Sequence, residues 1–228
     1  MLALLKMISF PVPKMLPSPH VSACEQLAEM LSPPRSDLHI QSLTTLEQLQ
    51  QLWKIDKQAY VDCSLEFDEF AQWWTLYPLG SQCLMSGNDI VASIGIYPLL
   101  QDQWQAFCSG TLPESSLVPV SLDRCEVSPQ HYWYASGIVV IEELRGWGAS
   151  PLKTLLQYAL SGWLSSSHVA YPLQLCAVAE YAIGAKILNH FGLVKQCDAA
   201  EMPNGCELYS ISLDSHRQAL HLLKSKGL

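Results

Sequence analysis

Apolar and polar positions along the chain follow two periods, one typical of strands and one typical of helices. Residues 131–141 are rich in aromatic and β-branched side chains, as in a buried strand. After a loop with two glycines, apolar residues recur at helical spacing, at Leu152, Leu155, Leu156, Ala159, Leu160 and Trp163. This spacing predicts an amphipathic helix, with Ser150 as its N-cap and Pro151 at its first position.

The rest of the chain from residue 38 onward shows the same two periods. Before the central strand we predict a strand, two helices and a hairpin, at residues 38–43, about 45–55, 64–74 and 81–97. After the central helix we predict a strand, a helix, two strands and a last helix, at residues 168–179, 182–191, 192–197, 206–213 and 215–226. Residues 101–130 show neither period, so they form either a functional loop or short elements that the pattern does not reveal.

Proline spacing separates an N-terminal arm from the body. Six prolines between positions 11 and 34 bracket one short helix, from Val21 to Leu31. We therefore divide the chain into an arm at 1–37, a main domain at 38–213 and a C-terminal helix at 214–228. The arm could pack on the body, reach the second subunit of a homodimer, or be partly disordered, and the sequence leaves these alternatives open.

Composition and charge exclude several classes of partner. The chain has 228 residues, of which 49% are hydrophobic, enough for one substantial core. Its 13 basic and 21 acidic residues give a net charge of −8 without a basic cluster, which argues against nucleic acid. The eight cysteines show no metal-ligand spacing and suit a reducing cytoplasm. No apolar run reaches the length of a membrane span, so we expect no membrane partner.

The loop between the central strand and helix has the composition of an anion site. Gly146 and Gly148 allow a tight turn and a close approach of the backbone to a ligand. Free N–H groups and the positive end of the helix dipole point into the same space, which favours a phosphate group. The motif is weak on its own, because a strand-to-helix turn with two glycines is more often only a turn.

The order of the elements gives this loop a context. From about Leu38 to Leu213 the chain resembles the GNAT family of acetyl-CoA-dependent N-acyltransferases. The loop 145–150 is similar to the family's Q/R-x-x-G-x-G/A element, and Ala182 to Leu193 looks like the family's helix ending in a Gly-Phe pair, here Gly192-Leu193. The resemblance implies an α/β fold with a mixed, mostly antiparallel sheet flanked by helices and splayed in the middle.

The resemblance also implies a cofactor site for acetyl-CoA, with no metal. Its pyrophosphate would lie on the loop, and its pantetheine arm would run between the strand ending near Ile141 and the strand 172–179. Main-chain N–H groups of the central strand would face the thioester. The implied cofactor-binding residues are Ile138, Val139, Val140, Arg145, Gly146, Trp147, Gly148, Ala149 and Ser150.

Two departures from the family concern cofactor binding and the reaction. Pro151 removes one N–H that could have met a phosphate. The tyrosine that often serves the family as an acid is replaced by Leu188, with Tyr181 and His190 as the nearby alternatives. Glu126 and His131, which precede the central strand, are the candidates for a general base, whereas Glu142 and Glu143 lie at its loop end. We therefore take Glu126, His131 and Tyr181 as the candidate catalytic residues.

Three functions follow from these observations. The first is transfer of an acetyl group from acetyl-CoA to an amine of a small molecule or a protein. The second is a non-catalytic module that binds an acyl-CoA or a partner on the same scaffold, which Leu188 favours. The third, another nucleotide binder, is the weakest, because no Lys-Ser/Thr pair follows the loop and a hairpin precedes it.

Overall fold

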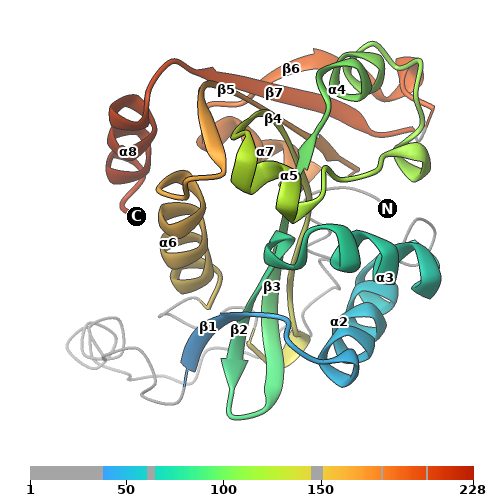
Figure 1. Ribbon diagram of the computed structural model, residues 1–228, viewed down its shortest axis with the longest axis vertical. Coiled ribbons are helices and arrows are strands. Elements are labelled where there is room, and N and C mark those ends of the chain that lie inside the picture. Colours follow the sequence, from blue (N-terminus) through green and yellow to red (C-terminus); the bar gives the residue numbers. More distant parts are fainter. Residues whose placement is uncertain (1–37, 61–64, 145–150, 181, 204) are drawn as a thin grey trace, which may run out of the picture.

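The fold is a mixed seven-stranded sheet between two layers of helices (Figure 1). The computed structural model describes residues 38–60, 65–144, 151–180, 182–203 and 205–228. The strands are β1 (Leu38–Ser42), β2 (Ser81–Ser86), β3 (Asp89–Leu99), β4 (Gln130–Val140), β5 (Val169–Ala179), β6 (Val194–Cys197) and β7 (Glu207–Leu213). Their order is β1-β2-β3-β4-β5-β7-β6, with β4 and β5 parallel and the other pairs antiparallel. The predicted fold class is confirmed.

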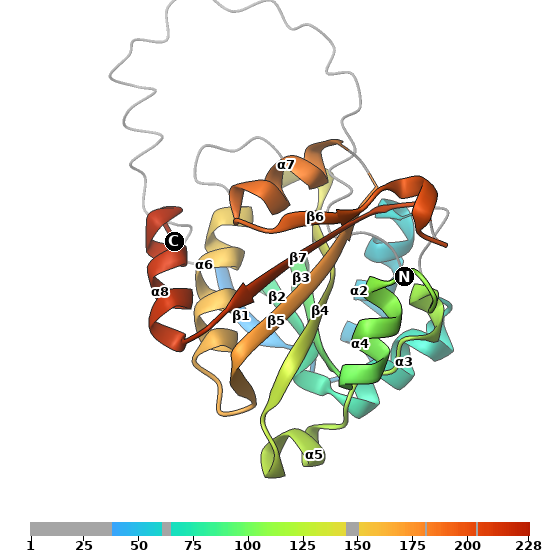
Figure 2. The same ribbon diagram turned by 90° about the horizontal axis from the view of Figure 1, so that it is seen from above.

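The helices cover both faces of this sheet (Figure 2). One face carries α2 (Leu46–Ala59), α3 (Phe67–Leu76) and α4 (Gln101–Cys108), and the other carries α6 (Pro151–Leu164), α7 (Ala182–His190) and α8 (His216–Ser225). The short helix α5 (Leu122–Val127) precedes β4. The 3-10 turns are η1 (Pro78–Gly80), η2 (Glu114–Ser116), η3 (Glu142–Leu144) and η4 (Ala199–Glu201).

Local signals in the sequence set the ends of several helices. The Thr45 hydroxyl caps α2 by accepting a hydrogen bond from the Gln48 N–H at 3.2 Å. Helix α3 starts with a capping box between Glu66 and Glu69, whereas the predicted range began at Ser64, which lies outside the described residues. Ser215, where the predicted last helix began, caps α8 by accepting a hydrogen bond from the Gln218 N–H at 3.3 Å.

Residues 101–130 contain the short elements α4, η2 and α5 rather than one long loop. Helix α4 packs on β4 through two aromatic contacts, Trp104 with Tyr132 and Phe107 with Tyr134, whose ring centroids are 5.4 Å and 5.2 Å apart. This insertion therefore lies on the α2 and α3 side of β4. It covers a part of the sheet that those two helices leave open.

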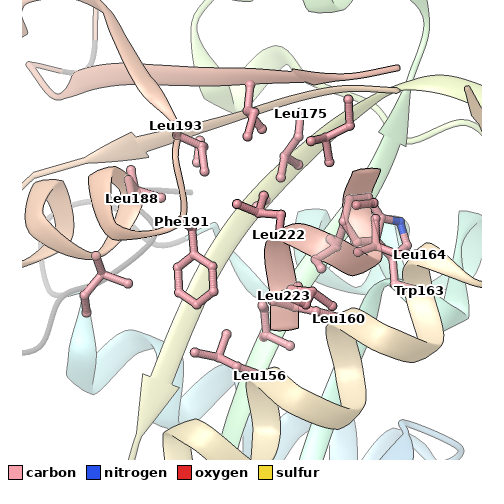
Figure 3. Close-up of a pocket in the computed structure, with 18 of the residues that line it drawn as sticks. Leu156, Leu160, Trp163, Leu164, Leu175, Leu188, Phe191, Leu193, Leu222 and Leu223 are labelled. Carbon is pink, nitrogen blue, oxygen red and sulfur yellow. The ribbon is translucent and has the colours of Figure 1, made fainter. Parts of the chain in front are cut away.

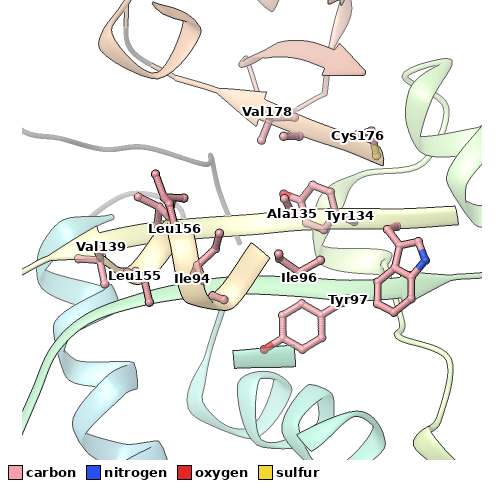
Figure 4. Packing of buried hydrophobic residues seen from close by; sticks show 14 of the residues in the cluster. Ile94, Ile96, Tyr97, Tyr134, Ala135, Val139, Leu155, Leu156, Cys176 and Val178 are labelled. Atoms are coloured by element: carbon pink, nitrogen blue, oxygen red, sulfur yellow. The ribbon is translucent and has the colours of Figure 1, made fainter. Parts of the chain in front are cut away.

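The core lies on both faces of the central strands β3 and β4. On one face Trp73 of α3 contacts the rings of Tyr97 and Tyr134. On the other face Leu155 and Leu156 of α6 pack over the sheet (Figure 4). Burying such side chains stabilises the fold by about 1.5–3 kcal/mol each. The two central strands are thereby held rigidly, which matters because the candidate site is built on them.

Candidate functional site

The parallel pairing of β4 and β5 stops halfway along β4, two residues before the end of β5. The last register pair is Ala135 with Ala177, and β4 continues to Val140 without pairing to β5. Beyond Ala177, β5 continues to pair with β7 only. Main-chain groups on this side of β4 must therefore find partners other than a strand. We call this point the split.

A β-bulge lies at the split. The register between β3 and β4 shifts from Gly95 opposite Gly137 to Ile96 opposite Ala135, so Ser136 is the extra residue. The bulge changes which side chains share a face of the sheet, because Ala135 and Ile138 now both point toward α6 and α7. Gly137 points toward α2 instead, where an added Cβ would lie 3.3 Å from the Tyr60 hydroxyl.

Beyond the bulge, the main-chain N–H and C=O groups of every second residue of β4 point toward the split. Ile141 donates its N–H to Val91 of β3 at 3.0 Å. Because these directions alternate along an antiparallel pair, the N–H and C=O groups of Ile138 and Val140 point away from β3. Those of Val139 point toward β3, opposite Ser93. Of the three residues predicted to face a thioester, Ile138 and Val140 have the suitable main-chain orientation.

Tyr60, at the C-terminal end of α2, satisfies the main chain of Ile138. Its hydroxyl accepts the Ile138 N–H at 3.1 Å and donates to the Ile138 C=O at 2.8 Å. The side chain is fully buried. A single hydroxyl thus occupies the two positions that a neighbouring strand, or the amide or carbonyl of a bound ligand, would otherwise fill.

One helical turn earlier, Asp56 is a buried acid beside the bulge. It lines a polar cavity of about 20 Å³ together with serine and tyrosine hydroxyls, those of Ser81, Ser93, Tyr97 and Ser136. Its Oδ2 has no hydrogen-bond partner among the described residues. Burial disfavours the charged carboxylate and raises the pKa of Asp56 to about 7. The cavity has room for about one water molecule, which needs roughly 10–15 Å³, and the acid titrates where a proton acceptor works best.

A second buried carboxyl lies on the insertion. Glu114 is 2% exposed and accepts a hydrogen bond from the Tyr134 hydroxyl of β4. Burial, followed by the neighbouring Glu114, raises the pKa of Tyr134 well above its ordinary value. Tyr134 is the residue before Ala135, so this pair lies next to the split but is sealed beneath α3 and α4.

The structure does not bring Glu126 and His131 to the split. Glu126 is exposed on α5, and His131 is exposed near the start of β4, where its Nδ1 lies 2.9 Å from the Pro172 carbonyl oxygen. Four residues of strand, roughly 13 Å, separate His131 from Ala135. Both side chains therefore lie near the opposite end of β4 from Ile138.

Several predicted site residues lie outside the described residues. They are Tyr181 and the whole loop Arg145, Gly146, Trp147, Gly148, Ala149 and Ser150. Within the described part of α7, His190 is exposed, whereas Leu188, at the expected tyrosine position, is 2% exposed. Its side chain lines an apolar cavity of about 70 Å³ between the sheet and helices α6, α7 and α8 (Figure 3).

Sequence reasoning missed Asp56, Tyr60 and the bulge. Asp56 carried a signal, because it takes a place in the buried stripe of Leu49, Leu52 and Ala59 along α2. Gly137 carried another, since a glycine inside a strand pattern is typical of a bulge. No comparable pattern marks Tyr60.

The described residues show neither a metal site nor a spanning helix. No three His, Cys, Asp or Glu side chains in this part of the chain gather as ligands would. None of its helices combines the length and apolar character needed to cross a bilayer.

Comparison with solved structures gives clear matches at low sequence identity. A chain of the NatC complex bound to Gag peptide and CoA shares 13% identity and a TM-score of 0.51, over 78% of this chain and 99% of that one. The loading GNATL domain of CurA from Lyngbya majuscula shares 13% identity and a TM-score of 0.55, over 81% and 98%. The GphF GNAT-like decarboxylase in complex with isobutyryl-CoA shares 13% and 0.52, over 76% and 98%. No family model matches the sequence, and no curated protein matches it.

Proposed function

We propose that this chain, which has the GNAT fold, transfers an acetyl group from acetyl-CoA to an amine of a small molecule or a protein. The observation that carries the proposal is the split. There, main-chain groups of β4 that point away from β3 lie close to Asp56, a buried acid whose pKa is raised to about 7. Two of the structural neighbours were solved with CoA or an acyl-CoA. One of these is a decarboxylase, so the fold alone does not fix the reaction.

In this proposal the described residues suit the thioester end of the cofactor. The pantetheine arm would lie against β4 beyond Ala135, and the acyl oxygen would accept the Ile138 N–H. Tyr60 would give up that N–H and could donate its own hydroxyl proton to the developing oxyanion. The pyrophosphate would lie on residues 145–150, and no metal takes part.

Asp56 is the proton acceptor in this scheme. The amine nitrogen attacks the thioester carbon, the C–S bond breaks, and CoA leaves as the thiolate or, after protonation, the thiol. The proton lost by the attacking nitrogen reaches the Asp56 carboxylate through a water molecule in the polar cavity. A thiol with an ordinary pKa of about 8.5 leaves without strong acid catalysis, so Leu188 in place of a tyrosine is compatible with turnover.

The alternative is a module that binds an acyl-CoA without turnover. It is favoured by Leu188 and by Tyr60, whose hydroxyl already occupies the main-chain groups that a reacting thioester would need. In this case Asp56 would be a purely structural acid.

The test is calorimetric titration with acetyl-CoA and CoA, followed by a thiol-release assay over a panel of amines. We expect micromolar binding and thiol release, with binding abolished in Gly148→Glu, because that change would place bulk and negative charge in the phosphate site. Binding without release on any amine would support the alternative. A folded protein that binds neither compound would overturn both.

A further inference from the structure

The apolar cavity behind the split has the chemistry of a hydrocarbon site. Its walls come from the strands β3, β4, β5 and β7 and from the helices α6, α7 and α8, together with Phe191 and Leu193 (Figure 3). Every lining side chain is a hydrocarbon except that of Trp163, whose indole N–H is buried without a hydrogen-bond partner among the described residues. An amide or an amine placed there would lose its hydrogen bonds to water without replacement. Apolar cavities of this kind also stay dry. The occupant that fits is therefore an alkyl chain.

One end of the cavity coincides with the split. Its lining includes Ala135 and Ala177, the last pair of the β4–β5 ladder, and Ile138 beyond the bulge. Small alanine side chains on both strands leave space at this end. This is where the acyl carbon of a CoA thioester would lie, so the inference rests on the proposed function.

The replacement at position 188 helps to make the wall continuous. A tyrosine there would put a hydroxyl near the cavity, whereas Leu188 presents only methyl groups. Helix α8 also lines the cavity, through Ala219, which is fully buried, and Leu222, which is half-buried. The C-terminal helix thus forms one wall of the cavity.

We propose that this cavity receives the hydrocarbon chain of an acyl-CoA, so that the site accepts acetyl-CoA but binds a donor with a medium-length chain more tightly. A volume of about 70 Å³ holds roughly five to seven groups of the size of water. Together with the carbonyl carbon at the split, this suits an acyl chain of about six to eight carbons. Each buried methylene adds about fourfold in affinity. Hexanoyl-CoA should therefore bind on the order of 100-fold more tightly than acetyl-CoA.

The test is titration of the full chain with CoA and with acetyl-, butyryl-, hexanoyl-, octanoyl- and palmitoyl-CoA. We expect affinity to rise to hexanoyl- or octanoyl-CoA and then to rise no further. Ala219→Leu should fill part of the cavity and remove the gain beyond butyryl-CoA, whereas Leu222→Ala should enlarge the cavity and move the optimum to longer chains. His221→Leu, an exposed change to the same side chain on the same helix, is the matched control. Thermal unfolding without ligand shows that each variant is folded.

The outcomes separate this inference from the proposed function. Equal affinity for all acyl lengths, with CoA binding intact and no response to either cavity variant, would overturn the inference alone. The hexanoyl thioester of N-acetylcysteamine, which lacks the nucleotide, provides the converse case. If this thioester binds and responds to Ala219→Leu as expected, while CoA and all acyl-CoAs do not bind, the acyl-chain inference is supported and the proposed CoA site is overturned. If no thioester binds at all, both are overturned.

Discussion

Protonation of the single side chain Asp56 makes the stability of the fold depend on pH. Its pKa in the folded protein is about 7, against an ordinary value of 3.8. Between these values the folded state keeps a proton that the unfolded state has lost, so stability falls as pH rises through this window. The contribution is fully present below about pH 4 and lost above about pH 7, and it amounts to about 4 kcal/mol at most.

We therefore expect Asp56→Asn to flatten the dependence of stability on pH between about 4 and 8. The asparagine is of similar size and cannot ionise, so the variant should gain stability relative to the wild type as the pH rises. Urea unfolding at a series of pH values measures this difference. Glu47→Gln, an exposed change in the same helix, is the control, and a wild-type profile parallel to that of Asp56→Asn would contradict the prediction.

The second prediction for a single residue concerns Tyr60. Tyr60→Phe leaves the N–H and C=O of Ile138 buried without the hydroxyl, at a cost of about 1–3 kcal/mol in unfolding free energy. Under the proposed function, acetyl-CoA should bind more tightly to this variant, since no protein bond has to break, and turnover should fall. Tyr158→Phe, on an exposed tyrosine of α6, should change neither quantity. Unaltered stability in Tyr60→Phe would refute the role assigned to the hydroxyl.

Individual site residues were the least predictable part of the chain. The main-chain role proposed for Ile138 and Val140 came from the resemblance, because it depends on the strand and not on side-chain identity. Asp56 and Tyr60 are buried against β4, and burial of a single polar side chain depends on tertiary packing. A sequence pattern contains that information only where, as at Asp56, a charge interrupts an apolar stripe.

At the scale of elements, two glycines should respond in opposite directions to the same substitution. Gly162 lies exposed in α6 with open space around it, so Gly162→Ala should stabilise the protein by about 0.5–1 kcal/mol. Gly95 faces the bulge, where an added Cβ would lie 2.1 Å from the Ser136 Oγ. Gly95→Ala should therefore destabilise it by about 1–3 kcal/mol. Paired denaturant curves measure both, and equal midpoints would be inconsistent with the bulge as described.

Long helices were predictable from their periods, and the short helices of the insertion were not. Helices α2 and α6, each of 14 residues, repeat their apolar spacing often enough for the helical period to be recognised in the sequence. Helices α4 and α5 have 8 and 6 residues, too few for a clear period, and prolines interrupt the chain between them. The bulge is a shift of one residue against a partner strand, which no single segment encodes.

For the whole molecule, ligand binding should raise thermal stability. A cofactor present at 100 times its Kd stabilises the folded state by about 2.7 kcal/mol, which corresponds to about 5–11 °C in Tm for a chain of this size. Thermal unfolding with and without acyl-CoA tests this directly. If the apolar cavity holds the acyl chain, hexanoyl-CoA should give a larger shift than acetyl-CoA at equal concentration. An equal shift would argue against the cavity as an acyl site.

The overall architecture could be predicted because the order of elements carries it. Strands, helices and the hairpin fall in sequence as the resemblance requires, and the mixed sheet is confirmed. The insertion at 101–130 and the apolar cavity beneath α8 could not be predicted, since both depend on how distant segments pack together.

The parallel pair at the centre of the sheet also sets how the chain must fold. Residues 130–135 meet residues 169–177 only after the crossover through α6 has brought two distant segments together. Closing such a connection costs entropy before any strand contact offsets it, and non-local pairing of this kind slows folding. We expect the hairpin β2–β3 to form early and the short β4–β5 ladder to form late, so the two strands that border the split are also the last pair of the sheet to join.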